Sequence, residues 1–226
     1  MSAFFVTATG TDIGKTFVTA GLVRHLRKAN AQVSALKPVA SGFDIATAAV
    51  SDAGVLLEAL DVPITPESIE RISPWRFAAP LSPDMAAARE GQAIDFESLV
   101  ALCRDAIAAE PGTLFIEGVG GAMAPLDQTH TVLDWMAALR VPLVVVAGSY
   151  LGTISHVLTA LDVLARRELN VAALVIDDSA DGAVPLEETM ATLRRFVPAP
   201  VVLIPRVKTW IDARADFARL WKALGP

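Results

Sequence analysis

Three consecutive residues near the start of the chain, Gly14, Lys15 and Thr16, have the types and order that bind a polyphosphate. A lysine ammonium can bridge the outer phosphates, and a threonine hydroxyl can bind Mg²⁺. The usual loop, G-x-x-x-x-G-K-[ST], would place its first glycine at Thr9, but Gly10 comes one residue later. The stretch is therefore either a chance GKT or a variant phosphate-binding loop, and the elements around it must decide.

Two carboxylates and a second lysine are candidates for the same chemistry. Glu117 closes the apolar run TLFIE and precedes GVGG, whose glycines let the backbone approach a phosphate closely. Asp52 opens a helical stretch, where capping of the helix is an equally good explanation. Lys37 precedes Pro38, which favours an extended backbone and ends the strand VSAL there. A magnesium nucleotide site needs such carboxylates, whereas a lysine just past a strand is often only a solvated side chain.

Short apolar runs alternate with amphipathic stretches along the chain. The runs expected to form strands span residues 3–7, 33–36, 113–117, 142–148, 171–176 and 201–205. The stretches with helical spacing span residues 15–29, 51–60, 96–108, 131–139, 154–168, 186–196 and 210–224. Strands that are apolar on both faces and separated by helices predict a doubly wound α/β fold, with a mainly parallel sheet and helices on both faces. We expect a single domain of the P-loop NTPase type over residues 1–226.

This order gives the GKT stretch the setting of a phosphate loop. A strand ends near Thr7, the glycine loop follows, and Lys15 starts a helix whose unpaired N–H groups and positive dipole end favour polyphosphate. In such sheets ligands bind beyond the carboxyl ends of the strands. The proline-containing segment of residues 70–88 interrupts the alternation. We expect it to be a long irregular connection, which is a common place for substrate contacts.

Composition argues against several classes of function. The net charge is −6, with a pI near 5.1 and scattered basic residues, so no nucleic-acid partner is expected. No apolar run approaches the roughly 18 residues of a membrane span, and the first residues lack a secretion signal, so we expect a cytoplasmic protein without a membrane partner. The only cysteine, Cys103, lies on an apolar helical face, which indicates core packing.

Several motifs together resemble those of dethiobiotin synthetase, the ATP-dependent family that closes the ureido ring in biotin synthesis. They are GTDIGKT, KPVASG, SDA, IEGVGG and IPRV, and KPVASG is the most telling because ordinary P-loop proteins have no reason to carry it. FAAPLSP, APLDQTHTVLDW, LGTISH and PAPVV extend the similarity over nearly the whole chain. The family's phosphate loop is longer than the usual one, with a threonine and an acidic residue before x-G-K-T, which accounts for Thr11 and Asp12.

The resemblance implies a reaction and a first set of roles. In this family CO2 carboxylates one amine of 7,8-diaminononanoate, the carbamate attacks the γ-phosphoryl group of MgATP, and the second amine displaces phosphate to close the ring. Lys15 and Lys37 would supply the positive charge that lets the two anions meet, with Lys37 beside the carbamate. Thr16, Asp52 and Glu117 would hold Mg²⁺.

The resemblance also implies further contacts and an oligomer. Besides these residues, ATP would contact the loop, the GVG stretch and the segments after the last strands, namely Asp12, Ile13, Gly14, Phe17, Gly118, Val119, Gly120, Asp177, Asp178, Pro205, Arg206, Val207 and Asp212. Thr11 and Ser41 would contact the small-molecule substrate. The far carboxylate of the diamine would bind at the helix start formed by Gly152, Thr153 and Ser155 of a neighbouring subunit, so a homodimer is expected.

Three positions depart from the family's pattern. The glycine at the strand end is Ala8 here, so we expect Gly10 to supply the flexibility of the loop. The family commonly has Asn-Asp for adenine, but this chain has Asp177 and Asp178. An ionised carboxylate at 177 can accept a hydrogen bond from adenine N6 but cannot donate one to N7, which predicts relaxed base selectivity or weaker ATP binding. A tyrosine that reaches the substrate carboxylate in some members is replaced by Thr189, which predicts looser binding of the substrate's tail.

Other functions stay open on the sequence alone. A partition-type ATPase switch resembles the expected fold but carries an additional lysine near the start of the phosphate loop, and residues 8–12 contain none. A cobyrinate-type amide synthase needs a glutaminase cysteine on an added domain, for which Cys103 is unsuited. A nucleotide-binding interaction module would bind ATP without turnover. Asp212, similarly, fits either a nucleotide contact or an exposed helix carboxylate.

Overall fold

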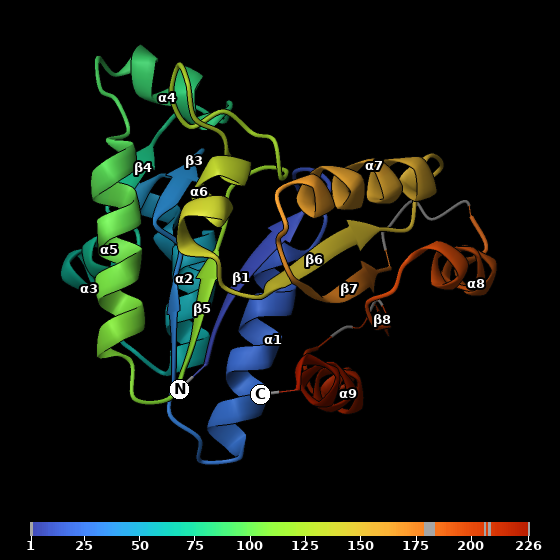
Figure 1. The fold of residues 1–226 in the computed structure, drawn as a ribbon. Coiled ribbons are helices and arrows are strands. Elements are labelled where there is room, and N and C mark those ends of the chain that lie inside the picture. The colour runs from blue at the N-terminus through green and yellow to red at the C-terminus, as the bar shows by residue number, and fades with distance from the viewer. Residues whose placement is uncertain (1, 179–183, 206, 208, 226) are drawn as a thin grey trace.

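The computed structural model describes residues 2–178, 184–205, 207 and 209–225. Within these residues six strands form one sheet in the order β2-β5-β1-β6-β7-β8, with all neighbours parallel (Figure 1). The strands are β1 (Ser2–Ala8), β2 (Val33–Leu36), β5 (Thr113–Glu117), β6 (Leu143–Gly148), β7 (Val171–Asp177) and β8 (Val201–Ile204). The expectation of a doubly wound parallel sheet is confirmed, and each of these strands ends within one residue of its expected bounds.

Helices cover both faces of the sheet (Figure 1). On one face pack α1 (Lys15–Lys28), α2 (Asp52–Leu60) and α9 (Arg214–Leu224), and on the other lie α5 (Phe96–Ala109), α6 (Val132–Leu139), α7 (Thr153–Arg166) and α8 (Leu186–Phe196). α9 begins four residues later than expected, because Asp212 accepts hydrogen bonds from the backbone N–H and hydroxyl of Thr209 and closes a turn first. Among the helices of the described residues, none is both long and apolar enough to cross a membrane.

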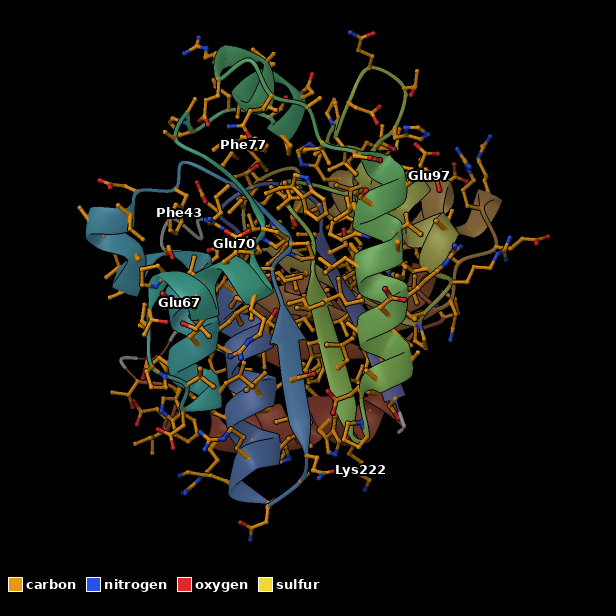
Figure 2. The ribbon with its side chains drawn as sticks, turned by 90° about the vertical axis from the view of Figure 1, so that its left-hand side faces the viewer. Phe43, Glu67, Glu70, Phe77, Glu97 and Lys222 are labelled. Carbon is orange, nitrogen blue, oxygen red and sulfur yellow. The ribbon has the colours of Figure 1, made fainter. Side chains whose placement is uncertain are left out.

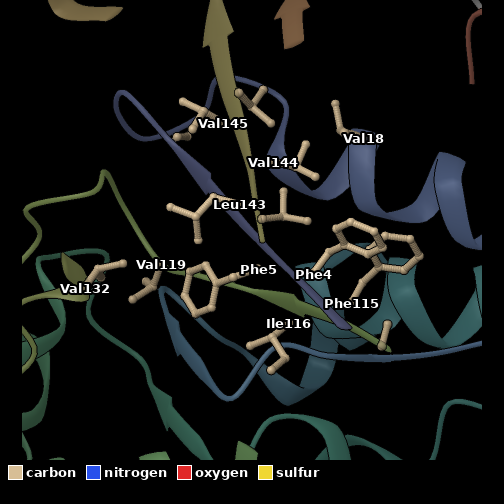
Figure 3. Close-up of a cluster of buried hydrophobic side chains, with 14 of the residues drawn as sticks. Phe4, Phe5, Val18, Phe115, Ile116, Val119, Val132, Leu143, Val144 and Val145 are labelled. Atoms are coloured by element: carbon tan, nitrogen blue, oxygen red, sulfur yellow. The ribbon is translucent and has the colours of Figure 1, made fainter. Parts of the chain in front are cut away.

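The central strand β1 is buried on both faces. Phe4 stacks on Phe115 of β5, with ring centroids 5.8 Å apart (Figure 3). Phe4 also meets Trp221 of α9 at 6.1 Å, and Phe5 packs edge-on against Trp135 of α6 at 4.8 Å. Successive side chains of a strand point to opposite faces, so these contacts join the sheet to both helical layers. The strand that carries the phosphate loop is therefore held from both sides.

The segment of residues 70–88 differs from the expectation, since most of it is regular. β4 (Trp75–Phe77) follows α3 (Pro66–Ile72) and precedes α4 (Pro83–Arg89) in the chain. It pairs in parallel with β3 (Val39–Ser41). A 3-10 helix, Ile45–Val50, precedes α2. The sequence pattern missed β3 and β4 because strands of three residues are too short to display an alternation.

Residues 78–82 form an irregular strap between β4 and α4. The backbone N–H of Gly42 donates to the carbonyl of Ala79 at 3.0 Å, and that of Phe43 donates to Phe77 at 2.9 Å, so the strap is held beside the end of β3. Figure 2 shows Phe77, Phe43 and Glu70 of α3 in the upper half of the view and Lys222 near the bottom. The strap thus lies over the end of the molecule where the strands finish.

Candidate functional site

The phosphate loop turns into α1 through two residues with left-handed backbone conformations. Asp12 has φ 56°, and Gly14, which precedes the first helical residue, has φ 89°. A side chain at Gly14 is also excluded by space, since a Cβ there would lie 2.2 Å from Oδ2 of Asp177. Gly10, which we expect to supply the flexibility of the loop, is not itself in the left-handed region. Gly10 instead packs closely against the backbone of Gly121.

The ammonium group of Lys15 is folded back onto the backbone around it. It donates to the carbonyl of Gly10 at 3.1 Å and to that of Gly120 at 2.7 Å, so it joins the phosphate loop to the segment after β5. The residue is only 7% exposed. Burial, and next the charge of Lys37, lower the pKa of Lys15 to about 8. A bound polyanion would favour the charged form of this amine.

Lys37 lies at the same end of the sheet because of strand register. β2 pairs with β5 so that Leu36 lies opposite Ile116, which brings the next residues, Lys37 and Glu117, side by side. The Lys37 ammonium lies 2.8 Å from Oε1 of Glu117, 2.8 Å from Oδ2 of Asp52 and 2.8 Å from the carbonyl oxygen of Gly118. Burial acts to lower the pKa of Lys37, but the two carboxylates outweigh it and hold that pKa above its ordinary value.

Thr16 lies between the two carboxylates. Its hydroxyl oxygen is 2.8 Å from Oδ1 of Asp52 and 2.7 Å from Oε1 of Glu117. The capping explanation for Asp52 is wrong, because Ser51 caps α2 by accepting from the N–H of Gly54, and Asp52 is the first helical residue. Burial acts to raise the pKa of Asp52, but Lys37 and then Thr16 outweigh it and hold that pKa below its ordinary value.

The geometry of these three side chains fits a divalent cation. The Thr16 hydroxyl has one proton but two carboxylate oxygens within hydrogen-bond distance, so one of these contacts has no proton to share. Oε2 of Glu117 is buried and has no hydrogen-bond partner among the described residues. Mg²⁺ binds through one or two carboxylates together with substrate phosphates. The two carboxylates and the hydroxyl fit a magnesium site of this kind, in which phosphates supply further ligands. A site made of protein ligands alone is not indicated, because the described residues contain no group of three or more His, Cys, Asp or Glu placed to hold a metal ion.

A cavity of about 680 Å³ opens at this site, lined by residues that follow β1, β2, β4 and β5, by two residues of β3 and by the first residue of α2. It brings together twelve of the expected site residues, Thr11, Asp12, Ile13, Gly14, Lys15, Thr16, Phe17, Lys37, Ser41, Asp52, Val119 and Gly120. Glu117 and Gly118 reach the same place through their contacts with Lys37. The loop, both lysines and Asp52 therefore share one cleft, and the buried Glu117 contacts two residues of its lining, Lys37 and Thr16.

The cavity wall also contains residues that the sequence did not single out as contacts. They come from β3, the strap, the start of α4 and the loop after β5, namely Ala40, Pro80, Leu81, Ser82, Pro83, Gly121 and Ala124. The proline cluster of the strap was the available signal, since it marked the segment as a place for substrate contacts. Ala40 and Ala124 carry no chemical signal at all, and only the folded chain reveals them.

The expected adenine contacts lie outside this lining. Asp177, at the end of β7, packs against Gly14, and Asp178 accepts a hydrogen bond from the hydroxyl of Ser149 at 3.3 Å. Asp212 is exposed and bonded to Thr209, as an exposed turn carboxylate would be. Pro205 and Val207 are also absent from the described lining, and Arg206 lies outside the described residues.

The expected carboxylate site at the start of α7 is separate from the cavity of the same chain. Gly152 has φ 99° and precedes the helix, Ser155 is exposed, and Leu151 is 86% exposed. The Thr153 hydroxyl donates to the last carbonyl of β6 at 2.6 Å. Thr189 is buried in α8, where its hydroxyl donates to a backbone carbonyl at 3.0 Å.

Cys103 is fully buried in α5, and burial raises the pKa of its thiol to about 12. We therefore expect the native thiol to react with a disulfide reagent at pH 8 about 1,000-fold more slowly than the thiol of the unfolded chain, from ionisation alone. Absorbance at 412 nm after addition of DTNB, with and without guanidinium chloride, measures both rates. Comparable rates in the two states would show that the cysteine is available as a nucleophile.

Comparison with known proteins finds relatives that share one name. A family model described as an AAA domain matches residues 2–210. The chain is 50% identical over 221 residues to the ATP-dependent dethiobiotin synthetase BioD of Acidiphilium cryptum, with 95% of this chain and 99% of that protein covered. It is 47% identical to the protein of the same name from Caulobacter sp. strain K31, with 100% and 97% covered.

Solved structures share the fold at low sequence identity. The MinC:MinD cell division protein complex of Aquifex aeolicus matches with a TM-score of 0.60 at 10% identity, over 100% of this chain and 96% of that one. The septum site-determining protein MinD of Pyrococcus horikoshii, complexed with Mg-ADP, matches with a TM-score of 0.54 at 12% identity, over 99% and 93%. These likenesses concern the architecture of the chain alone.

Proposed function

The chain belongs to the ATP-dependent dethiobiotin synthetase family, and from this premise we propose that its cavity carboxylates 7,8-diaminononanoate with CO2 and closes the ring at the expense of ATP. The observation that carries the proposal is the convergence of Lys15, Lys37 and Asp52 on one cavity, with the buried Glu117 bonded to Lys37. A carbamate and a triphosphate repel each other, and cations held in a partly dry site offset that repulsion far more than they would in water.

The triphosphate would lie along the loop, at the start of α1. Its oxygens would accept from the N–H groups at Gly14, Lys15 and Thr16, which point outward because a helix leaves its first N–H groups unpaired. The Lys15 ammonium, already aimed by two backbone carbonyls, would contact the outer phosphates. Thr16, Asp52 and Glu117 would hold Mg²⁺, which when bound neutralises charge on those phosphates.

The diamine would lie between the strap and the end of β3. The carbon of CO2 forms a bond with one amine nitrogen, which releases a proton and leaves a carbamate beside Lys37. A carbamate oxygen then attacks the γ-phosphorus, and the bond from that phosphorus to ADP breaks. The nitrogen of the second amine forms a bond with the carbamate carbon and loses a proton, and the bond from that carbon to the phosphate oxygen breaks, so phosphate leaves and the ring closes. Ser41 and Thr11, which line the cavity, would orient the substrate.

The expected homodimer and cytoplasmic location are parts of the same proposal. The start of α7 is exposed and lies outside the cavity of its own chain, which supports a role across a subunit interface. There the first N–H groups of the helix would bind the far carboxylate of the diamine.

Base selectivity at Asp177 gives a test that is independent of the reacting centre. We expect Asp177→Asn to increase the preference for ATP over GTP, because an amide both donates and accepts hydrogen bonds whereas a carboxylate only accepts them. The preference is measured as the ratio of kcat/KM for the two nucleotides. Comparable ratios in wild type and variant would count against a contact between this side chain and the base.

Phosphate release tests the proposed reaction itself. We expect phosphate release from MgATP to be strongly accelerated when 7,8-diaminononanoate and bicarbonate are both present, because the carbamate is the attacking nucleophile. Release that ignores the diamine would indicate a partition-type switch. Binding of ATP with no release under any condition would indicate an interaction module.

A further inference from the structure

The Lys37 ammonium makes three contacts, which is as many as it has protons. They are Oε1 of Glu117, Oδ2 of Asp52 and the carbonyl oxygen of Gly118, each at 2.8 Å. The side chain is 2% exposed. An ammonium group has three donors and no acceptor. In this arrangement Lys37 therefore has no N–H left for a carbamate, and it can serve the substrate only after one of these contacts breaks.

Two of the three acceptors are the carboxylates that fit a divalent cation. Glu117 and Asp52 each face both the Lys37 ammonium and the Thr16 hydroxyl, and Oε1 of Glu117 is shared between the two. The ammonium and a divalent ion on the same oxygens would lie within a few ångströms of each other, inside a site where like charges repel strongly. The two cations therefore compete for one pair of carboxylates.

Local charge gives the direction of this competition. The two carboxylates carry two negative charges and Lys37 supplies one positive charge, while Lys15 is held by the carbonyls of Gly10 and Gly120 rather than by either carboxylate. A divalent ion supplies two positive charges where the Lys37 ammonium supplies one, and it arrives with a polyphosphate that the Lys15 ammonium attracts. Its arrival replaces the ammonium as the partner of the carboxylates.

Resting on the proposed function, we propose that Lys37 is a built-in cation that occupies the carboxylate pair and is displaced toward the carbamate position when the metal-nucleotide complex binds. Displacement couples the two halves of the site. Lys37 becomes available to the carbamate only once the metal-nucleotide complex is in place, which orders the assembly of the reactants.

Metal binding without nucleotide tests the competition directly. The concentration of free Mn²⁺, measured by electron paramagnetic resonance, gives its affinity for wild type, Lys37→Met and a matched control, Lys28→Met. Lys28 is exposed and its ammonium lies 4.5 Å from the ring centre of Trp210, outside the cavity. We expect Lys37→Met to bind Mn²⁺ at least about 10-fold more tightly than wild type, within the usual range of coupling between sites. Lys28→Met should match wild type.

A measurement on wild type avoids any folding defect of the variant. The side-chain ammonium resonance of Lys37, observed by ¹⁵N NMR and assigned by comparison with Lys37→Met, should stay in place with ADP and EDTA and shift when Mg²⁺ is added to the ADP complex. A resonance unchanged by MgADP, or moved equally by ADP with EDTA, would overturn the proposal. So would equal Mn²⁺ affinity in folded wild type and Lys37→Met. If either result overturned this proposal while wild type still showed diamine-dependent phosphate release, the proposed function would stand and only the displacement of Lys37 would be wrong.

Discussion

Replacement of Lys37 by methionine is expected to lower kcat for diamine-dependent phosphate release by about 100- to 1,000-fold, the usual cost of removing one charge-stabilising donor from a transition state. Methionine fills most of the buried space but removes the charge that we propose lies beside the carbamate. The Lys37 ammonium contacts Glu117 and Asp52 rather than the phosphate loop. We therefore expect the Kd for MgATP to stay near its wild-type value or to become tighter.

The measurement compares kcat from phosphate release with the Kd for MgATP from calorimetry without diamine. Lys28→Met serves as the matched control, because it removes the same charge from an exposed position outside the cavity. Glu117 is fully buried, so loss of its partner is expected to cost about 3–5 kcal/mol of stability unless a divalent ion replaces it. Thermal unfolding with Mg²⁺ checks that the variant is folded. Matched losses in kcat and MgATP affinity would contradict the place given to Lys37.

Replacement of Lys15 by methionine is expected to damage binding and turnover together. The Lys15 ammonium is buried and held by the carbonyls of Gly10 and Gly120, and we propose that it binds the phosphates before and during the reaction. A hydrogen bond to a charged group is worth about 1.5–3 kcal/mol, which predicts a loss of about 10- to 100-fold in MgATP affinity. We expect kcat to fall as well, by about 100-fold or more, because charge accumulates on the transferring phosphoryl group.

The same two assays separate Lys15→Met from Lys37→Met. The first should weaken MgATP binding, and the second should not. If Lys15→Met bound MgATP as tightly as Lys28→Met does, the triphosphate could not lie along the loop as proposed. The contrast between the two cavity lysines thus tests their roles within one set of measurements.

Strand order and register explain why part of the site was predictable from the sequence. The GKT stretch after a strand and before a helix predicted the loop, and Pro38 predicted that Lys37 would follow the end of β2. These are local signals, and the structure confirms both positions. That Lys37 lies beside Glu117 depends on the pairing of β2 with β5, which are separated in the chain by the 76 residues from Lys37 to Gly112. The residues of one strand do not indicate which other strand will pair with it in the sheet.

Two details of the site differ from what the sequence alone indicated, namely the backbone conformation of the phosphate loop and the role of Asp52. The sequence pointed to Gly10 for the flexibility of the loop, but the left-handed backbone conformations fall at Asp12 and Gly14, and Asp177 packs closely against Gly14. Capping was an open explanation for Asp52 until Ser51 proved to be the cap. Ser51 is the chain neighbour of Asp52, but the partners of the Asp52 carboxylate, Lys37 and Thr16, come from other elements, which the spacing of residues could not reveal.

The central claim is that carbamate and triphosphate meet between Lys15 and Lys37. The most direct test is a crystal structure of wild type with a non-hydrolysable ATP analogue, Mg²⁺, 7,8-diaminononanoate and bicarbonate. We predict a carbamate oxygen within about 3 Å of the Lys37 ammonium, and the terminal phosphate analogue within the same distance of Lys15. A carbamate bound elsewhere, with Lys37 still held by Glu117 and Asp52 beside the bound metal, would contradict the account.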